Sequence, residues 1–238
     1  MKVESLADRP DIDIGDAAII GRVRSFTMTS VERLSALVDA VRYVSRQRIP
    51  GSIVECGVWR GGSMMAAALT LIEEADRERE LYLYDTFDGM TQPNDDHDQS
   101  FDNKLASAQL RDRVHGAGVL CKASLEDVKQ NVSSTGYPSA KTHYVRGKVE
   151  STIPEVVPKS ISVLRLDTDW YESTRHELQF LFPLISPGGL LIIDDYGHWK
   201  GARKACDEYF EQLPFKPFLN RIDYTGRIMQ IPYKGREA

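Results

Sequence analysis

The sequence predicts an α/β fold in which helices cover both faces of a mostly parallel β-sheet. Three stretches of the chain indicate this class. Residues 163–195 read as strand, helix, turn and strand, which is the pattern of a βαβ unit with parallel, buried strands. Residues 52–74 read as a strand, a glycine-rich turn and a helix. Residues 218–231 read as two short strands joined at residues 223–226, so we expect the sheet to end in an antiparallel C-terminal hairpin.

Length and composition describe an ordinary globular chain. It has 238 residues, of which 42% are hydrophobic and 27% charged, and its net charge is −5. We expect an N-terminal arm over residues 1–24, loose or laid on a partner subunit, and a single domain over residues 25–238. The acidic balance argues against a nucleic-acid partner. Three widely spaced cysteines fit a cytoplasmic location, and no apolar run is long enough to span a membrane.

Acidic residues end both strands of the βαβ unit. Asp167 and Asp169 follow the first strand, and Asp194 and Asp195 follow the second. Because open α/β sheets bind ligands at the carboxyl ends of their strands, we expect these four side chains to crowd together at a ligand site. Neighbouring carboxylates repel one another unless a cation or proton intervenes, and Mg²⁺ suits such oxygen ligands best. The alternative is that these acids cap helices or lie in loops.

The glycine-rich turn is the second candidate site. Gly57, Gly61 and Gly62 allow a tight turn and close approach of a ligand, and the helix that follows offers free N–H groups. The pattern favours a nucleotide-like ligand. Its spacing does not match G-x-G-x-x-G, which argues against an oxidoreductase with a dinucleotide. Asp85 ends the next strand and is positioned to bind ribose hydroxyls, with residues 86–90 turning over ribose or adenine.

The remaining segments supply helices and connections. Thr29 and Glu32 form a capping box that predicts a helix starting at Thr29. Ser124, with Asp127 three residues later, predicts another helix start. The polar residues 91–102 are expected to form a mobile surface loop or lid. We also expect helices over residues 103–116 and 200–212, a strand over residues 141–149 and a short apolar element over residues 119–123.

Several motifs together resemble the macrocin O-methyltransferase family of class I S-adenosylmethionine-dependent enzymes, which methylate sugars of natural products. The motifs are Thr-Met-Thr at 27–29, Val-Glu-Cys-Gly-Val-Trp-Arg-Gly-Gly-Ser at 54–63, Asp-Thr-Phe-Asp-Gly-Met at 85–90, Gly-Lys-Val-Glu at 147–150, Leu-Asp-Thr-Asp-Trp-Tyr-Glu-Ser-Thr at 166–174 and Ile-Asp-Asp-Tyr-Gly at 193–197. The last two are specific in combination. The resemblance covers residues 25–231 and implies a Rossmann-like, seven-stranded sheet with a reversed last strand.

The resemblance also implies roles for individual residues. S-Adenosyl-L-methionine would lie on the first half of the sheet. Mg²⁺ would be held by Asp167, Asp194 and Asp195, and Asp169 would be the catalytic general base. The residues implied to bind the cofactor are Thr29, Glu55, Gly57, Val58, Gly61, Gly62, Ser63, Asp85, Thr86, Phe87, Val149, Glu150 and Asp167.

The identity of the base and of the acceptor stays open in the sequence. His198 follows the second acidic pair closely and titrates in a useful range, so it rivals Asp169 as the base. We expect a Mg²⁺-dependent O-methyltransferase that acts on a sugar of an antibiotic-type glycoside. The alternatives are methylation of a catechol or other phenolic diol, whose adjacent oxygens suit the same metal, and a nucleotide-dependent oxidoreductase. The resemblance and the N-terminal arm suggest a homo-oligomer.

Overall fold

The computed structural model describes residues 9–115 and 121–233. Its seven-stranded sheet has the order β3-β2-β1-β4-β5-β7-β6. The strands are β1 (Ser52–Cys56), β2 (Leu81–Asp85), β3 (Thr142–Arg146), β4 (Ile161–Leu166), β5 (Ile185–Ile193), β6 (Asn220–Arg221) and β7 (Arg227–Gln230). Strands β1 to β5 pair in parallel, whereas β7 pairs antiparallel with both β5 and β6. The predicted fold class, including the C-terminal hairpin, is confirmed.

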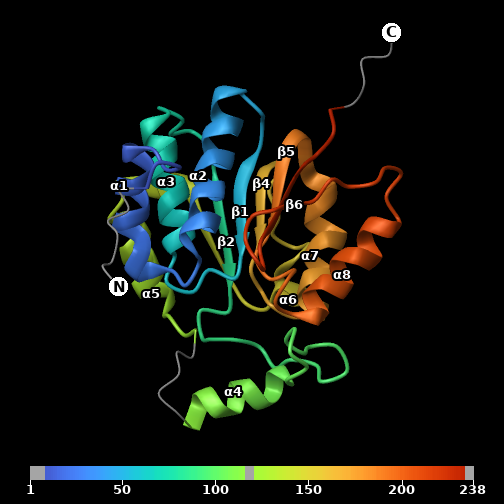
Figure 1. The fold of residues 1–238 in the computed structure, drawn as a ribbon. Coiled ribbons are helices and arrows are strands. Elements are labelled where there is room, and N and C mark those ends of the chain that lie inside the picture. Colours follow the sequence, from blue (N-terminus) through green and yellow to red (C-terminus); the bar gives the residue numbers. More distant parts are fainter. Residues whose placement is uncertain (1–8, 116–120, 234–238) are drawn as a thin grey trace.

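Helices cover both faces of this sheet (Figure 1). On one face lie α1 (Ile14–Val23), α2 (Val31–Arg46), α3 (Gly62–Glu73) and α5 (Leu125–Ser133), and on the other lie α6 (Val149–Thr152), α7 (Tyr171–Leu181) and α8 (Lys200–Glu211). Helix α4 (Ala106–His115) stands away from both layers. None of the described helices has the length and apolar character needed to cross a bilayer.

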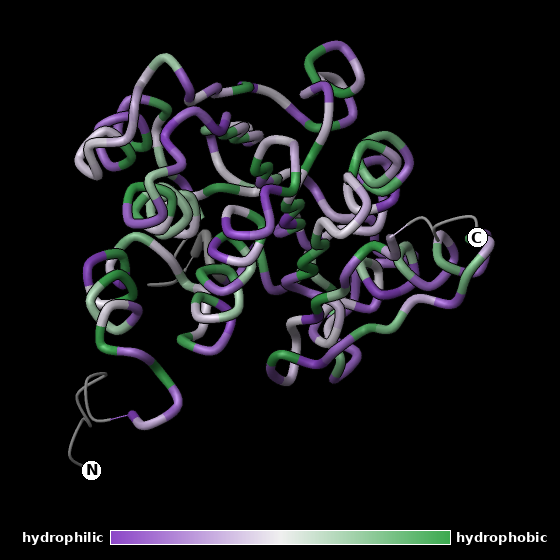
Figure 2. The backbone as a smooth tube through the Cα atoms, turned by 90° about the horizontal axis from the view of Figure 1, so that it is seen from above, coloured by the Kyte–Doolittle hydropathy of each residue, from purple (hydrophilic) through white to green (hydrophobic). Residues whose placement is uncertain are grey.

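Successive side chains along each strand point to opposite faces of the sheet, so the hydrophobic core has two parts. Ile53 and Val163 pack with the helices of the first face, whereas their neighbours Val54 and Leu164 pack with those of the second. Because both faces are buried, the strands read as continuous apolar runs rather than alternating patterns. Figure 2 shows this arrangement from above, with the strands at the centre and many hydrophilic residues on the outer sides of the helices.

The strand order reverses at β1. From β1 the chain moves outward through β2 and β3, and then crosses to β4 on the other side of β1. Ligands of open α/β sheets bind at such a switch point, beyond the carboxyl ends of the strands. Pairing continues just past these ends, because Asp167 N–H donates to Cys56 O at 2.9 Å and Asp194 N–H donates to Leu166 O at 2.9 Å. The acids that follow β4 and β5 are therefore held in register with one another.

The N-terminal segment differs from the predicted loose arm. From residue 14 onward it forms α1, in which Ile19, Ile20 and Val23 are buried in the core. The carboxylate of Asp16 in this helix pairs with Arg42 of α2 at 2.6 Å. Helix α1 is thus an integral part of the first helical layer, while residues 1–8 lie outside the described part of the chain.

Helix α2 begins later than predicted. Its N-cap is Ser30, whose hydroxyl oxygen accepts the N–H of Arg33 at 3.1 Å. The hydroxyl of Thr29 is buried and accepts a hydrogen bond from Arg165 at 2.8 Å instead. The predicted capping box is therefore wrong, because a long-range contact engages Thr29 and its neighbour supplies the cap. The predicted cap of α5 is confirmed, since Ser124 Oγ accepts the N–H of Asp127 at 3.1 Å.

The polar segment before α4 is anchored rather than exposed throughout. Asp98 is 1% exposed, and its carboxylate accepts the N–H groups of Asn94 at 2.7 Å and Tyr171 at 2.8 Å. Ser100 forms a bridge with Trp199. The hydrogen bond from Tyr171 ties this segment to the start of α7, so the expected surface loop is anchored at Asp98. Residues 119 and 120 of the predicted apolar element lie outside the described residues, and residues 121–123 belong to no helix or strand.

Candidate active site

A cavity opens at the carboxyl ends of β1, β2 and β4. Its walls come from the turn after β1, the segments after β2 and β3, and the loop between β4 and α7. It is lined by Met28, Gly57, Trp59, Tyr84, Asp85, Thr86, Gly89, Met90, Thr91, Cys121, Gly147, Lys148, Val149, Glu150, Asp167, Thr168, Asp169, Trp170 and Ser173. Of the predicted cofactor residues, Gly57, Asp85, Thr86, Val149, Glu150 and Asp167 are in this lining, whereas Thr29, Glu55, Val58, Gly61, Gly62, Ser63 and Phe87 are not.

The glycines of the turn serve close packing inside the protein. Gly57 has φ of +84°, and a Cβ there would overlap the carbonyl oxygen of Asp167. Gly61 has φ of +88° and is the N-cap of α3. A Cβ on Gly62 would lie 2.7 Å from the backbone of Phe26. Gly57 thus lets the turn pack against the loop after β4 in the cavity wall, whereas Gly62 lets the start of α3 pack against Phe26, outside the described lining.

Asp85 fastens the same turn to β2. One carboxylate oxygen accepts the N–H groups of Val58 at 2.7 Å and Trp59 at 3.0 Å, and the other accepts the N–H of Phe87 at 2.8 Å. Val58 and Phe87 therefore contribute through their backbones. Oδ2 of Asp85 already accepts two N–H groups, so its remaining capacity to accept a hydrogen bond lies on Oδ1, which the Thr86 hydroxyl approaches at 3.3 Å.

A buried arginine connects the ends of β1, β4 and β5. The side chain of Arg165 is 2% exposed and donates to Glu55 at 2.6 Å, to Asp167 at 2.6 Å and also to Asp194. Glu55 is 1% exposed, and its Oε2 has no hydrogen-bond partner in the described part of the chain. Burial raises the pKa of the Glu55 carboxyl to about 7, although Arg165 opposes the shift.

Three of the four carboxylates expected to crowd together converge at the ends of β4 and β5. One oxygen from each of Asp167, Asp194 and Asp195 lies within 4.8 Å of the others. We call these three residues the acid cluster. Asp194 is already neutralised in part, because it pairs with both Arg165 and Arg33. In contrast, Oδ2 of Asp195 is buried and lacks a hydrogen-bond partner among the described residues.

The acid cluster fits a hard divalent cation. Mg²⁺ binds carboxylate oxygens and usually keeps several water ligands, so three carboxylates with one unpartnered buried oxygen suit it. Burial raises the pKa of Asp167 and of Asp195, and the charges of neighbouring acids raise them further. A bound cation would act in the opposite direction, because it stabilises the ionised carboxylates.

Asp169 belongs to both the cavity and the surroundings of the acid cluster. It lines the cavity. Burial is the main reason why the pKa of Asp195 is raised, and the charge and hydrogen bonding of Asp169 raise it further. Its backbone is left-handed, with φ of +68°, a conformation that few residues other than glycine adopt. The adjacent Thr168 donates its hydroxyl to the buried Glu177 of α7 at 3.1 Å. That contact fixes the loop that presents Asp169.

His198, the rival base, occupies a different position. It is absent from the described lining of the cavity, and its Nδ1 lies 3.0 Å from the hydroxyl oxygen of Tyr224. Its backbone N–H donates to the carbonyl of Asp195 at 3.0 Å. The imidazole of His198 is thus engaged with Tyr224 outside the described cavity lining, whereas Asp169 lines the cavity.

Sequence reasoning missed three charged residues around the site. Arg165 interrupts an otherwise apolar strand, Arg33 lies on α2 and pairs with Asp194 and Asp223, and Glu177 is fully buried in α7. A charge inside a buried strand almost always has a partner, so the Arg165 position was a usable signal. Nothing local to Arg33 or Glu177 indicated their contacts, because both form only when distant elements pack.

Comparison with known proteins agrees with this geometry. A family model described as Macrocin-O-methyltransferase (TylF) matches residues 20–230. The 8-demethyl-8-(2,3-dimethoxy-alpha-L-rhamnosyl)-tetracenomycin-C 4'-O-methyltransferase of Streptomyces olivaceus is 34% identical over 200 residues, covering 84% of this chain and 73% of that protein. The mycinamicin III 3''-O-methyltransferase of Micromonospora griseorubida is 32% identical over 200 residues, covering 84% of this chain and 76% of that protein.

A solved structure extends the similarity to the fold. The O-methyltransferase NovP superposes with a TM-score of 0.75 at 28% identity, covering 87% of this chain and 82% of that chain. Methyl transfer is common to these matches, which excludes the nucleotide-dependent oxidoreductase considered from the sequence.

Proposed function

We propose that this chain, which belongs to the macrocin-O-methyltransferase family and is an S-adenosylmethionine-dependent O-methyltransferase, methylates a sugar hydroxyl of an antibiotic-type glycoside with the aid of Mg²⁺. The position of Asp169 carries the proposal, because this carboxylate faces the cavity and adjoins the acid cluster. An acceptor hydroxyl that lies between the methyl donor and a cation at the acid cluster would lose its proton to a base in this position. Two relatives are named for methylation of glycosylated natural products, which supports a sugar acceptor.

The part of the site beyond β1 and β2, which we call the cofactor half, would bind and orient S-adenosylmethionine. This cofactor supplies a methyl group already activated as a sulfonium. Asp85 lies at the cavity surface for the ribose, and Val149 and Glu150 border the part of the cavity assigned to adenine. Glu55 and Ser63 do not line the cavity, and would support its wall from behind through Arg165 and the start of α3. Preorganised contacts of this kind position the methyl group before the reaction.

The part of the site beyond β4 and β5, which we call the acid half, would activate the acceptor. When bound to Asp167, Asp194 and Asp195, Mg²⁺ supplies Lewis acidity that lowers the pKa of an acceptor hydroxyl. Asp169 takes the proton that this hydroxyl loses as its oxygen attacks the methyl group. We assign the base to Asp169 rather than to His198, since His198 lies outside the described cavity lining and is engaged with Tyr224.

Transfer of a radiolabelled methyl group tests this function. S-Adenosylmethionine labelled in the methyl group is incubated with methyl α-L-rhamnoside, 4-methylumbelliferyl α-L-rhamnoside or catechol, with Mg²⁺ and again with EDTA. We expect label in a glycoside with Mg²⁺, little label with EDTA, and none in catechol. Glu211 is exposed on α8, so the variant Glu211→Gln, prepared and assayed in parallel, serves as the control and should behave as the wild type. Label in catechol alone would contradict the sugar acceptor, and label that persists in EDTA would contradict the role of the cation.

A further inference from the structure

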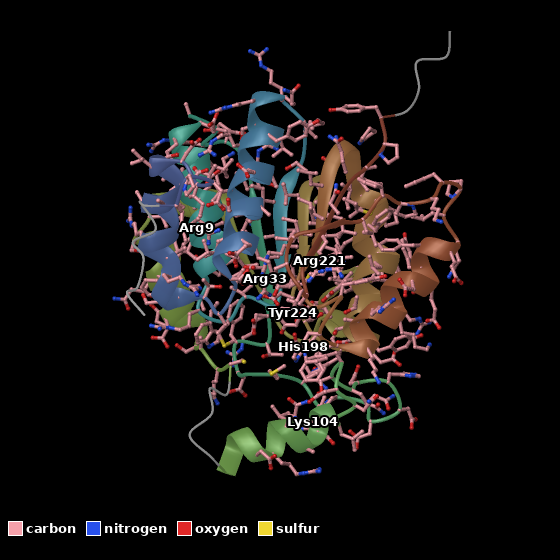
Figure 3. The ribbon with its side chains drawn as sticks, viewed as in Figure 1. Arg9, Arg33, Lys104, His198, Arg221 and Tyr224 are labelled. Carbon is pink, nitrogen blue, oxygen red and sulfur yellow. The ribbon has the colours of Figure 1, made fainter. Side chains whose placement is uncertain are left out.

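Three aromatic rings from three separate segments meet beside the acid cluster. Phe101 comes from the loop before α4, His198 from the loop after β5, and Tyr224 from the turn between β6 and β7. Their centroids are 5.6 Å apart for Phe101 and His198, 6.0 Å for His198 and Tyr224, and 6.3 Å for Phe101 and Tyr224. We call these three rings the aromatic rim. Figure 3 shows Tyr224 and His198 between Arg33 and the segment that carries Lys104.

Backbone contacts hold the rim in place. Phe101 N–H donates to His198 O at 2.8 Å, which ties the loop before α4 to the loop after β5. Gly197 N–H donates to Thr225 O at 2.9 Å, and a Cβ on Gly197 would overlap the carbonyl oxygen of Tyr224. The hydroxyl of Tyr224 also lies 3.0 Å from Nδ1 of His198. Three segments thus converge on one fixed arrangement of rings.

The rim is directly continuous with the acid cluster. His198 N–H donates to the carbonyl of Asp195, and the hydroxyl of Thr225 donates to the carbonyl of Asp194 at 2.8 Å. Burial raises the pKa of the Tyr224 hydroxyl, and the charges of Asp195 and Asp194 contribute in the same direction. A molecule held at the acid cluster would therefore meet the rim with the part that extends outward.

The rings remain accessible despite their contacts. Phe101 is 62% exposed and Tyr224 is 55% exposed. Their edge-to-face packing leaves apolar ring surface open to solvent, and aromatic surface of this kind gains free energy when a flat apolar group covers it. Single exposed apolar residues are ordinary on protein surfaces, but a fixed cluster of rings beside a polar site is a feature of ligand-binding surfaces.

We infer that the aromatic rim is a subsite for the aglycone, and that it stacks against a flat apolar ring attached to the methylated sugar. The inference rests on the proposed function, because it takes the sugar hydroxyls to the acid cluster and Asp169. The rim lies outward of those acids, so it contacts the next ring along the acceptor rather than the reacting sugar. It selects that ring by shape and apolar contact, while the acids select hydroxyl groups.

Binding of two matched glycosides tests the subsite. Methyl α-L-rhamnoside and 4-methylumbelliferyl α-L-rhamnoside share the sugar and differ in the aglycone, and each is titrated by calorimetry in the presence of S-adenosylhomocysteine and Mg²⁺. We expect the wild type to bind the aryl glycoside about 3- to 10-fold more tightly, the range expected of aromatic stacking. Phe101→Ala and Tyr224→Ala should each reduce this preference, and Phe101→Tyr, which keeps a ring, should retain it.

A matched control separates the rim from general apolar surface. Phe218 is 78% exposed and belongs to none of the rim contacts, so Phe218→Ala should leave the preference unchanged. Equal affinity of the wild type for the two glycosides, or a preference that survives Phe101→Ala and Tyr224→Ala, would overturn the subsite. So would a wild type that binds S-adenosylhomocysteine but neither glycoside. Failure to bind S-adenosylhomocysteine would instead count against the proposed function.

Discussion

The two halves of the sheet on either side of the switch point build their parts of the site by different means. On the side of β1 and β2, backbone geometry dominates, because Gly57 fits against a carbonyl group and Asp85 collects N–H groups from the turn. On the side of β4 and β5, charged side chains dominate, with Arg165 and Arg33 bound to the acids. The cofactor half thus depends on chain conformation, and the acid half on charge balance. Substitutions should therefore damage the two halves separately.

Asp169→Asn is expected to separate the two halves most clearly, because it should lower kcat without changing cofactor affinity. The amide keeps the size of the side chain but cannot take a proton, so kcat should fall by about 10²- to 10⁴-fold. Because the cofactor half is untouched, the affinity for S-adenosylhomocysteine should stay near the wild-type value. Steady-state rates and calorimetry measure the two effects, with Glu211→Gln as control. A collapse of cofactor affinity in Asp169→Asn would show that the halves are not separable at this residue.

Arg165→Met challenges the charge balance of the acid half. The substitution leaves the buried carboxylates of Glu55 and Asp194 without their shared cation, so the free energy of unfolding should fall by about 3–5 kcal/mol. Denaturant unfolding with and without Mg²⁺ measures this. Arg46→Met, at a site 63% exposed, removes an ion pair with Glu74 and should change stability far less. Equal effects of the two variants would contradict the special role of Arg165.

Gly57→Ala challenges the conformation of the cofactor half. Gly57 and Gly136 both have positive φ, of +84° and +81°, but only Gly57 has a neighbour in the way of a Cβ. Gly136→Ala should cost only the left-handed strain of about 1–2 kcal/mol. Gly57→Ala should cost more, because the loop after β4 must also move, and it should weaken binding of S-adenosylhomocysteine. Matching unfolding curves for the two variants would argue against close packing as the reason for this glycine.

A pH dependence of stability is expected from Glu55, which lies at the junction between the two halves. The Glu55 carboxyl has its pKa raised from 4.5 to about 7, first of all by burial. The folded protein then holds this proton more tightly than the unfolded chain, so the contribution of Glu55 to stability falls as pH rises from 4.5 to 7. Glu55→Gln cannot lose a proton, and should flatten this part of the profile. Thermal unfolding across that range, without Mg²⁺, compares the two proteins; parallel profiles would contradict the assignment.

The features that local sequence could predict are those that depend on neighbouring residues. The apolar runs that end in Asp167 and Asp194 predict two strands. They also predict that the acids after these strands lie close together, because parallel strands bring their carboxyl ends to one edge of the sheet. The helix cap at Ser124 depends only on a residue three positions away. The hairpin turn between β6 and β7 is likewise local.

Features that depend on distant partners could not be predicted in this way. Thr29 looked like a cap until packing brought it to Arg165, 136 residues away in the sequence. Asp16 and Asp98 looked like solvent-exposed acids, but each is buried by a partner from another element. Periodicity assigns a residue to a strand or helix, and the partners of a buried charge are known only once the elements are packed.

Calorimetric titration of S-adenosylhomocysteine, with Mg²⁺ and again with EDTA, tests the central claim that the cation serves the acid half and its acceptor. NAD⁺ is the control ligand. The division of the site predicts binding of S-adenosylhomocysteine with similar affinity in both conditions, and no heat from NAD⁺. Affinity that disappears in EDTA would contradict the claim, because the cation would then belong to the cofactor half.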